Sequence, residues 1–465
     1  MGTWGSFCMG YADVGANIYI TLGLIALYAL GASPVVLALA AVAYVATGLS
    51  YAELASLYPV AGGAQFYAQR AYGDFHGFMA GWGLMLGYTI DIALFALATV
   101  GYLGFIERAI FTSSILLTSP YFGITAVGLI AVLVGLNIVG IKWSSRFNEI
   151  FVVLGLATAV LILGAGIPLI ILNGSIWNWI DSLREIGTNP SWNQFVFATS
   201  LAMVSFIGIE SISQAAEETR RPGKVIPLAS KSAVVSVAVI AIASSLIFVN
   251  LVPVHLFESV SQYPVVEMAS RFPLIGIGFA LWVAFTGFAI CYVSTNTGVI
   301  GVSRVMFSMG RLRLAPQFLR RLNKHHTPHM TITIFSIGAS LLIVANLFLS
   351  GLDLLTLIAS LYSFGALIAY MYVNLSMIVL RMKDNRVRPW KMRGNISFRR
   401  NNHKVDVPIL PIFGFIATAL VWSVIVGTNP TGRLLGAIWF LIGVLLYFWY
   451  RRRSGLPLLR SAPES

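Results

Sequence analysis

Apolar runs of about 20 residues recur along the whole chain, and they constrain its fold more than any other feature of the sequence. A run of this length crosses the hydrocarbon core of a bilayer, about 30 Å thick, as a single α-helix. We count twelve such runs, at residues 7–30, 34–57, 77–105, 121–141, 149–172, 192–214, 228–252, 274–303, 331–350, 353–380, 408–427 and 433–450. Only 10% of the 465 residues are charged, against about 25% in a soluble domain. The sequence therefore predicts an all-α integral membrane protein.

The formal net charge of +13 must be judged by where the basic residues fall. If the N-terminus is cytoplasmic and each span reverses direction, only four of the 30 lysines and arginines lie outside: Arg108, Arg184, Arg271 and Arg433. This bias follows the positive-inside rule. It predicts a multi-pass protein of the cell membrane with both termini in the cytoplasm. It also accounts for the charge without a nucleic acid as partner.

Two of the spans are interrupted by glycine beside an acidic residue. The first span carries GYADVGANIY at 10–19, with Asp13 at its centre, and the sixth carries SFIGIES at 205–211, with Glu210 near its end. The sixth span opens a second group of five if the first five form a repeat. Matched interruptions in two halves are typical of inverted-repeat transporters, whose binding site lies near the membrane midplane. The simpler interpretation, that the glycines only allow close helix packing, explains a single break better than two.

An interrupted membrane helix exposes backbone groups that need a cavity or a ligand. The helix N-terminus after a break carries partial positive charge and suits a carboxylate. The carbonyl end before a break suits an ammonium group or a metal cation. Two such breaks facing each other match the two ends of a zwitterion.

Three acidic residues fall inside predicted spans: Asp13, Asp91 and Glu210. A carboxylate at membrane depth costs about 2.5–3.5 kcal/mol on insertion scales, so its default interpretation is functional. Without a basic residue nearby, charge balance favours a cationic cargo, which is a substrate amine, Na⁺ or H⁺. For Asp91 the alternative is a polar contact with a neighbouring helix.

Other functional classes find little support. The chain has no H-E-x-x-H, G-x-S-x-G or Cys/His arrangement typical of an enzyme. Cys8 and Cys291 lie in apolar runs and resemble small buried hydrophobes. Three histidines at 325–329 lack the cysteine or acid that would complete a metal site. A channel or a receptor remains an alternative, although a receptor usually carries a soluble domain.

Three motifs resemble the amino acid–polyamine–organocation (APC) superfamily. They are YAELASLYPVAGGAQFYAQRAYGDFHGFMAGW at 51–82, VSFIGIES with the tail AAEETRRPGKVIP at 204–227, and GVSRVMFSMGRLRLAPQF at 301–318. The resemblance implies a leucine-transporter-type fold, with a 5+5 inverted repeat, broken helices 1 and 6, and two extra C-terminal helices. It also implies transport of amino acids or related amines.

By position, the resemblance also implies roles for individual residues. Backbone amides at the first break would hold the substrate carboxylate, and carbonyls at the second would face its ammonium group. With the two buried acids, the implied substrate-binding residues are Asp13, Gly15, Ala16, Asn17, Asp91, Ser205, Phe206, Ile207 and Gly208. Glu210 matches an acid implicated in proton-linked gating. Val204 stands where some relatives have a gating tryptophan, so Phe206 or Tyr88 would have to gate.

The chain departs from the family pattern at three positions. Asn17 replaces a glycine, and Asp13 replaces an apolar residue. Gly155 stands where many proton-coupled members have a lysine, which argues against a lysine-based proton switch here. A sodium ion could replace that amine, with Val14, Ser294 and Thr295 as its candidate ligands, since hard cations prefer oxygen. The alternative is that the hydroxyls of CYVSTNTG at 291–298 bond to their own helix.

Two further acids, Glu217 and Glu218, precede Arg220, Arg221 and Lys224 in the sequence. They are either an inner-gate ion pair or solvated surface charge. Glu53 is expected to be structural or gate-forming in the cytoplasmic third of the second span.

These observations predict one transporter domain over residues 1–465. Its parts are a first repeat at 7–172, a second repeat at 192–380, a basic loop at 381–407, two further helices at 408–450 and a cytoplasmic tail at 451–465. The expected function is secondary active transport of an amino acid or related amine by alternating access, coupled to Na⁺ or H⁺ or working by exchange. A polyamine or inorganic-cation carrier is the alternative. We expect no cofactor beyond a coupling ion, a lipid bilayer as surroundings, and a monomer or homodimer.

Overall fold

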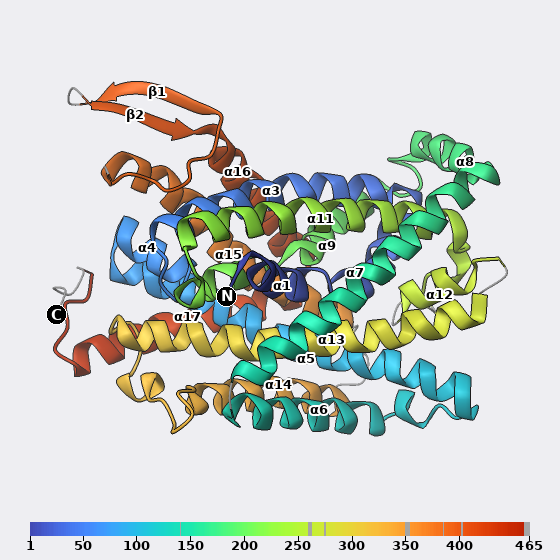
Figure 1. Ribbon diagram of the computed structural model, residues 1–465, viewed down its shortest axis with the longest axis horizontal. Helices are drawn as coiled ribbons and strands as arrows, with labels where there is room; N and C mark the ends of the chain where they lie inside the picture. Colours follow the sequence, from blue (N-terminus) through green and yellow to red (C-terminus); the bar gives the residue numbers. More distant parts are fainter. Residues whose placement is uncertain are drawn as a thin grey trace.

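The computed structural model describes residues 1–139, 141–258, 263–273, 276–348, 354–384, 386–400 and 403–459. Most of the long helices lie along the longest axis of the molecule, and α7 crosses them obliquely (Figure 1). The long helices are α3 (Ser33–Leu57), α5 (Asp74–Phe111), α6 (Tyr121–Val139), α7 (Ile141–Leu172), α11 (Pro222–Leu251), α13 (Gly276–Arg311), α14 (His329–Phe348), α15 (Leu354–Lys383), α16 (Ile409–Thr428) and α17 (Pro430–Arg453). The shorter helices are α1 (Thr3–Val14), α2 (Ile18–Ala29), α4 (Ala64–Tyr72), α8 (Ser175–Ser182), α9 (Trp192–Ala202), α10 (Glu210–Gln214) and α12 (Pro264–Ser270).

Within the described residues, ten helices are long and apolar enough to cross a membrane. One of these, Thr3–Leu57, contains the first two predicted runs, and His329–Ala345 is a shorter apolar helix. All twelve predicted runs fall on helical structure, apart from the breaks at 15–17 and 207–209 and run ends at 140, 252, 274–275, 349–350, 353 and 408. Of these, 140, 274–275, 349–350 and 353 lie outside the described residues, as do residues 460–465 of the expected tail. The predicted helical membrane fold is confirmed, whereas the count of twelve crossings and the 5+5 repeat stay predictions.

Small residues bring the central helices close together. α5 packs against both α13 and α15, and α3 packs against α11. A Cβ atom added at Gly365 of α15 would lie 2.6 Å from the carbonyl oxygen of Gly83 in α5, so the two backbones touch there. Because lipid tails are as apolar as leucine, such close packing is a main source of helix association in a bilayer.

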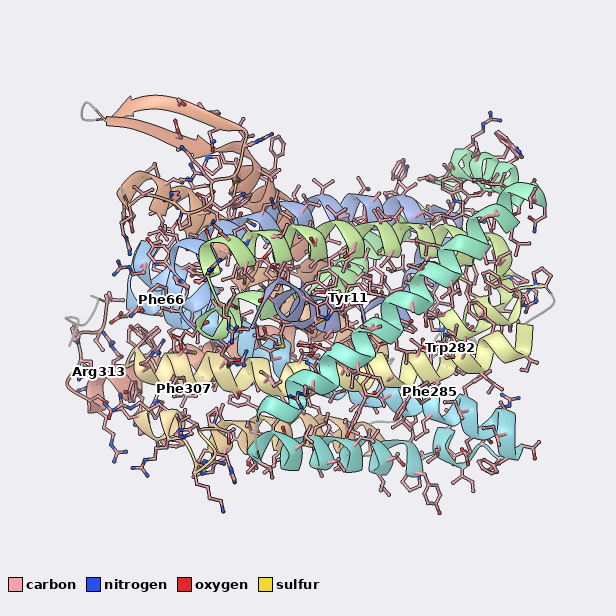
Figure 2. The ribbon with its side chains drawn as sticks, viewed as in Figure 1. Tyr11, Phe66, Trp282, Phe285, Phe307 and Arg313 are labelled. Carbon is pink, nitrogen blue, oxygen red and sulfur yellow. The ribbon has the colours of Figure 1, made fainter. Side chains whose placement is uncertain are left out.

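The two ends of the molecule differ in charge and structure. The C-terminus and the strands β1 (Asn395–Arg400) and β2 (His403–Pro408) lie at one end, with α8 and α12 at the other (Figure 1). Arg313 lies at the same end as the C-terminus, while Tyr11 of α1 lies near the middle of the long axis (Figure 2). We call the end with β1, β2 and Arg313 the basic end.

The antiparallel hairpin β1–β2 is the one departure from the predicted all-α class among the described residues. It lies within the stretch that the sequence analysis assigned to a basic loop, and Asn395 pairs with Pro408 in its register. The segment before it is fixed to α3 by buried ion pairs. Glu53 contacts the guanidinium group of Arg381 at 2.6 Å and that of Arg388 at 3.2 Å, and it accepts a hydrogen bond from the backbone N–H of Met392.

Candidate functional site

The first helix is broken where the sequence predicted. α1 ends at Val14 and α2 begins at Ile18, with a turn between them. A Cβ atom added at Gly15 would lie 2.7 Å from the ring of Tyr11, so glycine allows that ring to fold back over the break. The side chain of Asn17 donates a hydrogen bond of 2.8 Å to the carbonyl oxygen of Ile207. The break in the first helix is therefore tied directly to the break in the sixth.

The sixth helix is broken at Gly208. α9 ends at Ala202, a 3-10 turn (η4, Met203–Phe206) follows, and α10 begins at Glu210. Gly208 has φ of +123°, and a Cβ atom there would lie 2.7 Å from Cγ of Asp13. Only glycine satisfies both the backbone conformation and this close approach. Ser205 of the same turn shares a hydrogen bond of 2.6 Å with Thr21 of α2, which gives a second link between the two breaks.

Glu210 and Tyr370 of α15 hold the second break in place. The backbone N–H of Gly208 is 3.1 Å from both Oε2 of Glu210 and the hydroxyl of Tyr370. The Tyr370 hydroxyl in turn donates to Oε2 of Glu210 at 2.6 Å. This carboxyl group therefore satisfies a backbone donor that the interrupted helix would otherwise leave exposed.

Asp13 lies opposite Gly208 and is completely buried. Its Oδ2 accepts a hydrogen bond from Ser211 of α10, whereas its Oδ1 has no hydrogen-bond partner among the described residues. The same holds for Oδ1 of Asn17, one turn further along. The polar atoms of the first break are thus only partly satisfied by the protein. Ala16, which precedes Asn17 in the first break, is also buried.

Asp91 approaches the site from α5. It is 0% exposed, and neither carboxyl oxygen has a hydrogen-bond partner among the described residues. A Cβ atom added at Gly298 of α13 would lie 2.5 Å from its Oδ2, so the carboxyl group presses against the α13 backbone. The hydroxyl of Tyr362 of α15 lies beside Asp91 as a possible donor outside ordinary hydrogen-bond geometry, and it is also near Asp13 and Glu210.

The three acids form one electrostatic cluster, because Asp13 interacts with both Asp91 and Glu210. We call these three residues the carboxyl cluster. Within the described part of the chain, no ion pair joins any of them to lysine or arginine. Removing a charge from water without pairing it costs a desolvation free energy on the order of several kcal/mol per ion. The cluster therefore favours either protons or a cationic ligand.

Several site residues carried no signal that the sequence analysis could use. Ser211, Tyr362 and Tyr370 contact the carboxyl cluster but were not predicted. Tyr362 and Tyr370 are eight residues apart on one helix, a spacing that places both on one face. That face could be recognised only with the position of α15 known.

The predicted gating aromatics are both buried near the cluster. Phe206 stacks on Tyr44 of α3, with ring centroids 5.0 Å apart. Tyr88 of α5 packs on α13, where a Cβ atom at Gly301 would lie 2.5 Å from its ring. Val204 is buried as well. All three carboxyl groups are at most 2% exposed, so the site is closed to both faces of the molecule.

Of the candidate sodium ligands, one oxygen has no hydrogen-bond partner in the described part of the chain, and the others bond within the protein. Ser294 Oγ is buried without a hydrogen-bond partner among the described residues, whereas Thr295 bonds to the carbonyl of Cys291 in its own helix. The carbonyl oxygen of Val14 accepts the backbone N–H of Asn17. A Cβ atom added at Gly155 would lie 3.3 Å from the side chain of Ile290 and 4.0 Å from the ring of Tyr11, so apolar and aromatic groups cover this position. The sodium site stays a prediction.

Two ion pairs join the turn after α10 to α13 at the basic end. Glu217 contacts Arg311 of α13 at 2.6 Å and accepts the backbone N–H of Ala61 at 2.9 Å. Glu218 contacts Arg304 of α13 at 2.6 Å. These partners lie in α13 and are not the neighbouring Arg220, Arg221 and Lys224, which were one of two possibilities open from the sequence. We call the two pairs the inner pairs. Burial would raise the pKa of Glu217, but hydrogen bonds from Arg311 and Ala61 outweigh it and hold that pKa below its usual range.

The chain is similar to known permeases. The family model described as "Amino acid permease" matches residues 1–449. The branched-chain amino acid permease BcaP of Bacillus subtilis is 26% identical, with 95% of this chain and 90% of the relative covered. The low-affinity putrescine importer PlaP of Escherichia coli is also 26% identical, covering 92% and 88%.

A solved Na⁺-coupled sialic acid symporter superposes with a TM-score of 0.54 at 13% identity, over 93% of this chain and 90% of the other. At this identity the likeness concerns the fold alone. The matched helix breaks, the three motifs and the family model over nearly the whole chain lead to one conclusion: this protein belongs to the amino acid permease family, within the APC superfamily.

Proposed function

We propose that this protein is a secondary active transporter of amino acids or related amines, and that the carboxyl cluster holds the ammonium group of its substrate. The observation that carries the proposal is the position of two buried acids with unpartnered oxygens, Asp13 and Asp91, beside two linked helix breaks. A protonated amine would supply the missing hydrogen-bond donors and the missing charge together.

The proposed binding mode follows from the contacts of the breaks. Oδ1 of Asp13 and the carboxyl group of Asp91 accept hydrogen bonds from ammonium groups. A substrate carboxylate, where there is one, binds at the start of α2, where the helix dipole favours negative charge. Phe206 covers the substrate on the side away from the inner pairs. Tyr88 lies against Gly301 of α13, nearer to the inner pairs than Asp91 at Gly298, and covers the substrate on the side toward them. The relatives named above include a permease for branched-chain amino acids and an importer of putrescine, so both classes belong in a substrate screen.

Alternating access then requires the inner pairs to separate. Arg311 and Glu217 are both more than one-third exposed, and ion pairs of this kind contribute about 0–1 kcal/mol each. Such weak contacts hold the basic end closed yet let it open at little cost. We place this end in the cytoplasm by the positive-inside rule.

The test is a stability screen of the purified protein, with and without Na⁺, followed by uptake into proteoliposomes. We expect at least one amino acid or amine to raise the unfolding temperature and to be taken up saturably. If replacing Na⁺ with choline abolishes uptake, the coupling ion is Na⁺. If uptake is unchanged, transport is coupled to protons or works by exchange. A chain that is neither stabilised by nor transports any amine or amino acid would contradict the proposal.

A second candidate is a polyamine or inorganic-cation carrier. Asp91 favours it, because a second unpartnered carboxyl group suits a second positive charge. For a diamine, Asp91→Asn should weaken uptake of the diamine by more than that of a monoamine of equal length. For an inorganic cation, neither amine should compete with it.

A further inference from the structure

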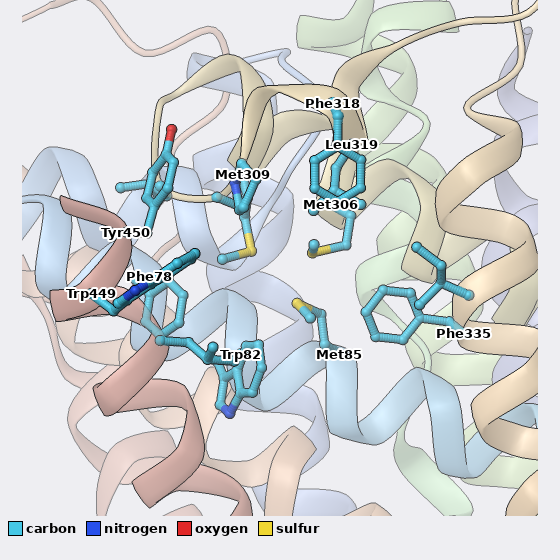
Figure 3. Close-up of a pocket in the computed structure, with 15 residues that line it drawn as sticks. Phe78, Trp82, Met85, Met306, Met309, Phe318, Leu319, Phe335, Trp449 and Tyr450 are labelled. Atoms are coloured by element: carbon cyan, nitrogen blue, oxygen red, sulfur yellow. The ribbon is translucent and has the colours of Figure 1, made fainter. Parts of the chain in front are cut away.

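An apolar crevice lies near the basic end, away from the carboxyl cluster. It has a volume of about 230 Å³ and lies between α5, α13, α14 and α17, under the turn at Gln317–Arg320. The sulfur atoms of Met85, Met306 and Met309 point into its middle, with Phe335 on one side and Trp82 and Trp449 on the other (Figure 3). Nearly all of its wall is carbon and sulfur, so a polar amine finds no hydrogen-bond partner there.

The crevice opens sideways between helices. Ile334 of α14 and Leu446 and Trp449 of α17 line it and are also exposed on the outside of the bundle. On membrane-spanning helices these outer faces meet acyl chains. An apolar cavity of about 150 Å³ already binds benzene, and water gains nothing by entering one. A crevice of this size with flexible methionine walls therefore suits a segment of hydrocarbon chain.

Three arginines lie next to residues that line the crevice. Arg313 precedes the lining residue Leu314, and Arg320 follows the lining residue Leu319. The guanidinium group of Arg453 lies over the ring of Trp449, 5.4 Å from its centre. All three arginines are exposed, and none forms an ion pair with another residue in the described part of the chain. Positive charge, unpaired among the described residues, therefore lies beside the apolar crevice.

We propose that this crevice is a binding site for an anionic phospholipid, with one acyl chain between the methionines and the headgroup phosphate on Arg313 and Arg453. This occupant alone matches both halves of the site, the apolar wall and the basic rim. A free phosphate would meet only the rim. In a zwitterionic lipid the cationic headgroup offsets the phosphate charge, so the arginines would add little to binding. Basic pockets between helices on the cytoplasmic side are a recognised form of lipid site, and the cytoplasmic leaflet supplies anionic headgroups.

The site is coupled to the inner pairs through α13. Met306 and Met309 lie between Arg304 and Arg311, which pair with Glu218 and Glu217. A Cβ atom added at Gly81 of α5 would lie 2.6 Å from the sulfur of Met309, so the crevice wall is also the contact between α5 and α13. A bound chain therefore stabilises the closed arrangement of this end.

The experiment uses the full chain, stripped of lipid in detergent. Phosphatidylglycerol, phosphatidylcholine with the same chains, or glycerol phosphate alone is then added. We expect phosphatidylglycerol to raise the unfolding temperature by several degrees more than phosphatidylcholine, and to remain bound in native mass spectrometry. Glycerol phosphate should do neither. An equal shift with both lipids, or a shift with glycerol phosphate, would overturn the proposal.

Two variants locate the effect. Arg313→Gln with Arg453→Gln should abolish the difference between the lipids, and Ala315→Leu, which fills part of the crevice, should reduce binding of both. The matched control is Arg220→Gln with Arg221→Gln, which removes two charges at the same end and, like the test pair, changes one arginine with positive φ. If the control variant also loses the difference in stabilisation between the two lipids, the proposed site is rejected. So would a disulfide between two copies of Leu446→Cys formed in high yield, because a second copy would then cover the crevice.

Discussion

At the scale of single residues, the site depends on side chains that approach each other more closely than their sequence positions suggest. Asp13, Gly208 and Glu210 were predicted because an acid beside a glycine in an apolar run is costly and therefore informative. Ser211 and Tyr370 were not predicted, although they bond to those same acids. Their roles arise from the contact of separate helices, and a serine or tyrosine in an apolar run is common enough to carry no signal alone.

Gly208→Ala tests the close approach at the second break. The added methyl group would meet Asp13 at 2.7 Å in a backbone conformation that alanine rarely adopts. We expect transport to fall by at least about tenfold, a change of about 1.4 kcal/mol or more in the relevant barrier. Gly164→Ala, where nothing lies within 4 Å of the new atom, is the matched control. Equal activity of the two variants would show that the approach is not required.

Asp13→Asn tests the charge of the first break while keeping its shape. The amide oxygen can still accept the hydrogen bond from Ser211, so the fold and the yield of protein should be unchanged. The negative charge that we assign to the substrate amine is lost, and uptake should fall by roughly tenfold or more, since tenfold corresponds to about 1.4 kcal/mol. Saturation kinetics in proteoliposomes measure the effect. Uptake at the wild-type rate and affinity would remove Asp13 from the site.

At the scale of helices, transport as proposed requires two helix breaks that contact each other and a basic end whose inner pairs can separate. The matched interruptions were visible in the sequence, because both contain glycine next to an acid. For Glu217 and Glu218 the sequence left open an ion pair with the nearby Arg220 and Arg221 or solvated surface charge, and the structure has ion pairs with other partners. The true partners are 94 and 86 residues away on α13, a distance that no local pattern bridges.

The inner pair of Glu217 predicts a pH dependence. Its pKa in the folded protein lies below the ordinary value of about 4.5, so the pair stabilises the closed end above that value. This stabilisation is lost as the pH falls from about 4.5 through the lowered pKa. Glu217→Gln imitates the protonated state. The variant should therefore unfold at a lower temperature than wild type at pH 7, and the difference should shrink below about pH 4.5. A difference that stays constant with pH would show that the charge of Glu217 is not its source.

At the scale of the whole molecule, hydropathy and charge were sufficient for the fold class, since only helices satisfy the backbone in the spans this chain offers. The hairpin β1–β2 was missed. Its sequence alternates apolar and polar residues in NISF and HKVDV, but so short a pattern within a basic stretch did not outweigh the expectation of a loop. The ion pairs that fix this region to α3 join residues more than 300 positions apart.

Arg381→Ala tests how that region is held. Glu53 would be left buried with its main partner removed, and such losses cost about 3–5 kcal/mol. We expect a marked fall in the unfolding temperature. Arg386→Ala removes a half-exposed arginine that pairs with Asp384, and the change should be small. Hydrogen bonds from Arg386 hold the pKa of Asp384 well below its usual range, so that smaller effect should also persist in mild acid. Similar losses in the two variants would show that burial of the Glu53 pair adds nothing.

The central claim is that the carboxyl cluster binds a positively charged amine. The most direct measurement is competition for uptake by the best substrate of the screen, using each amine beside its N-acetyl derivative, which keeps the size but loses the charge. The account predicts that the amine competes in wild type, that its acetylated form does not, and that Asp13→Asn removes most of this preference. Equal competition by both forms in wild type would contradict it.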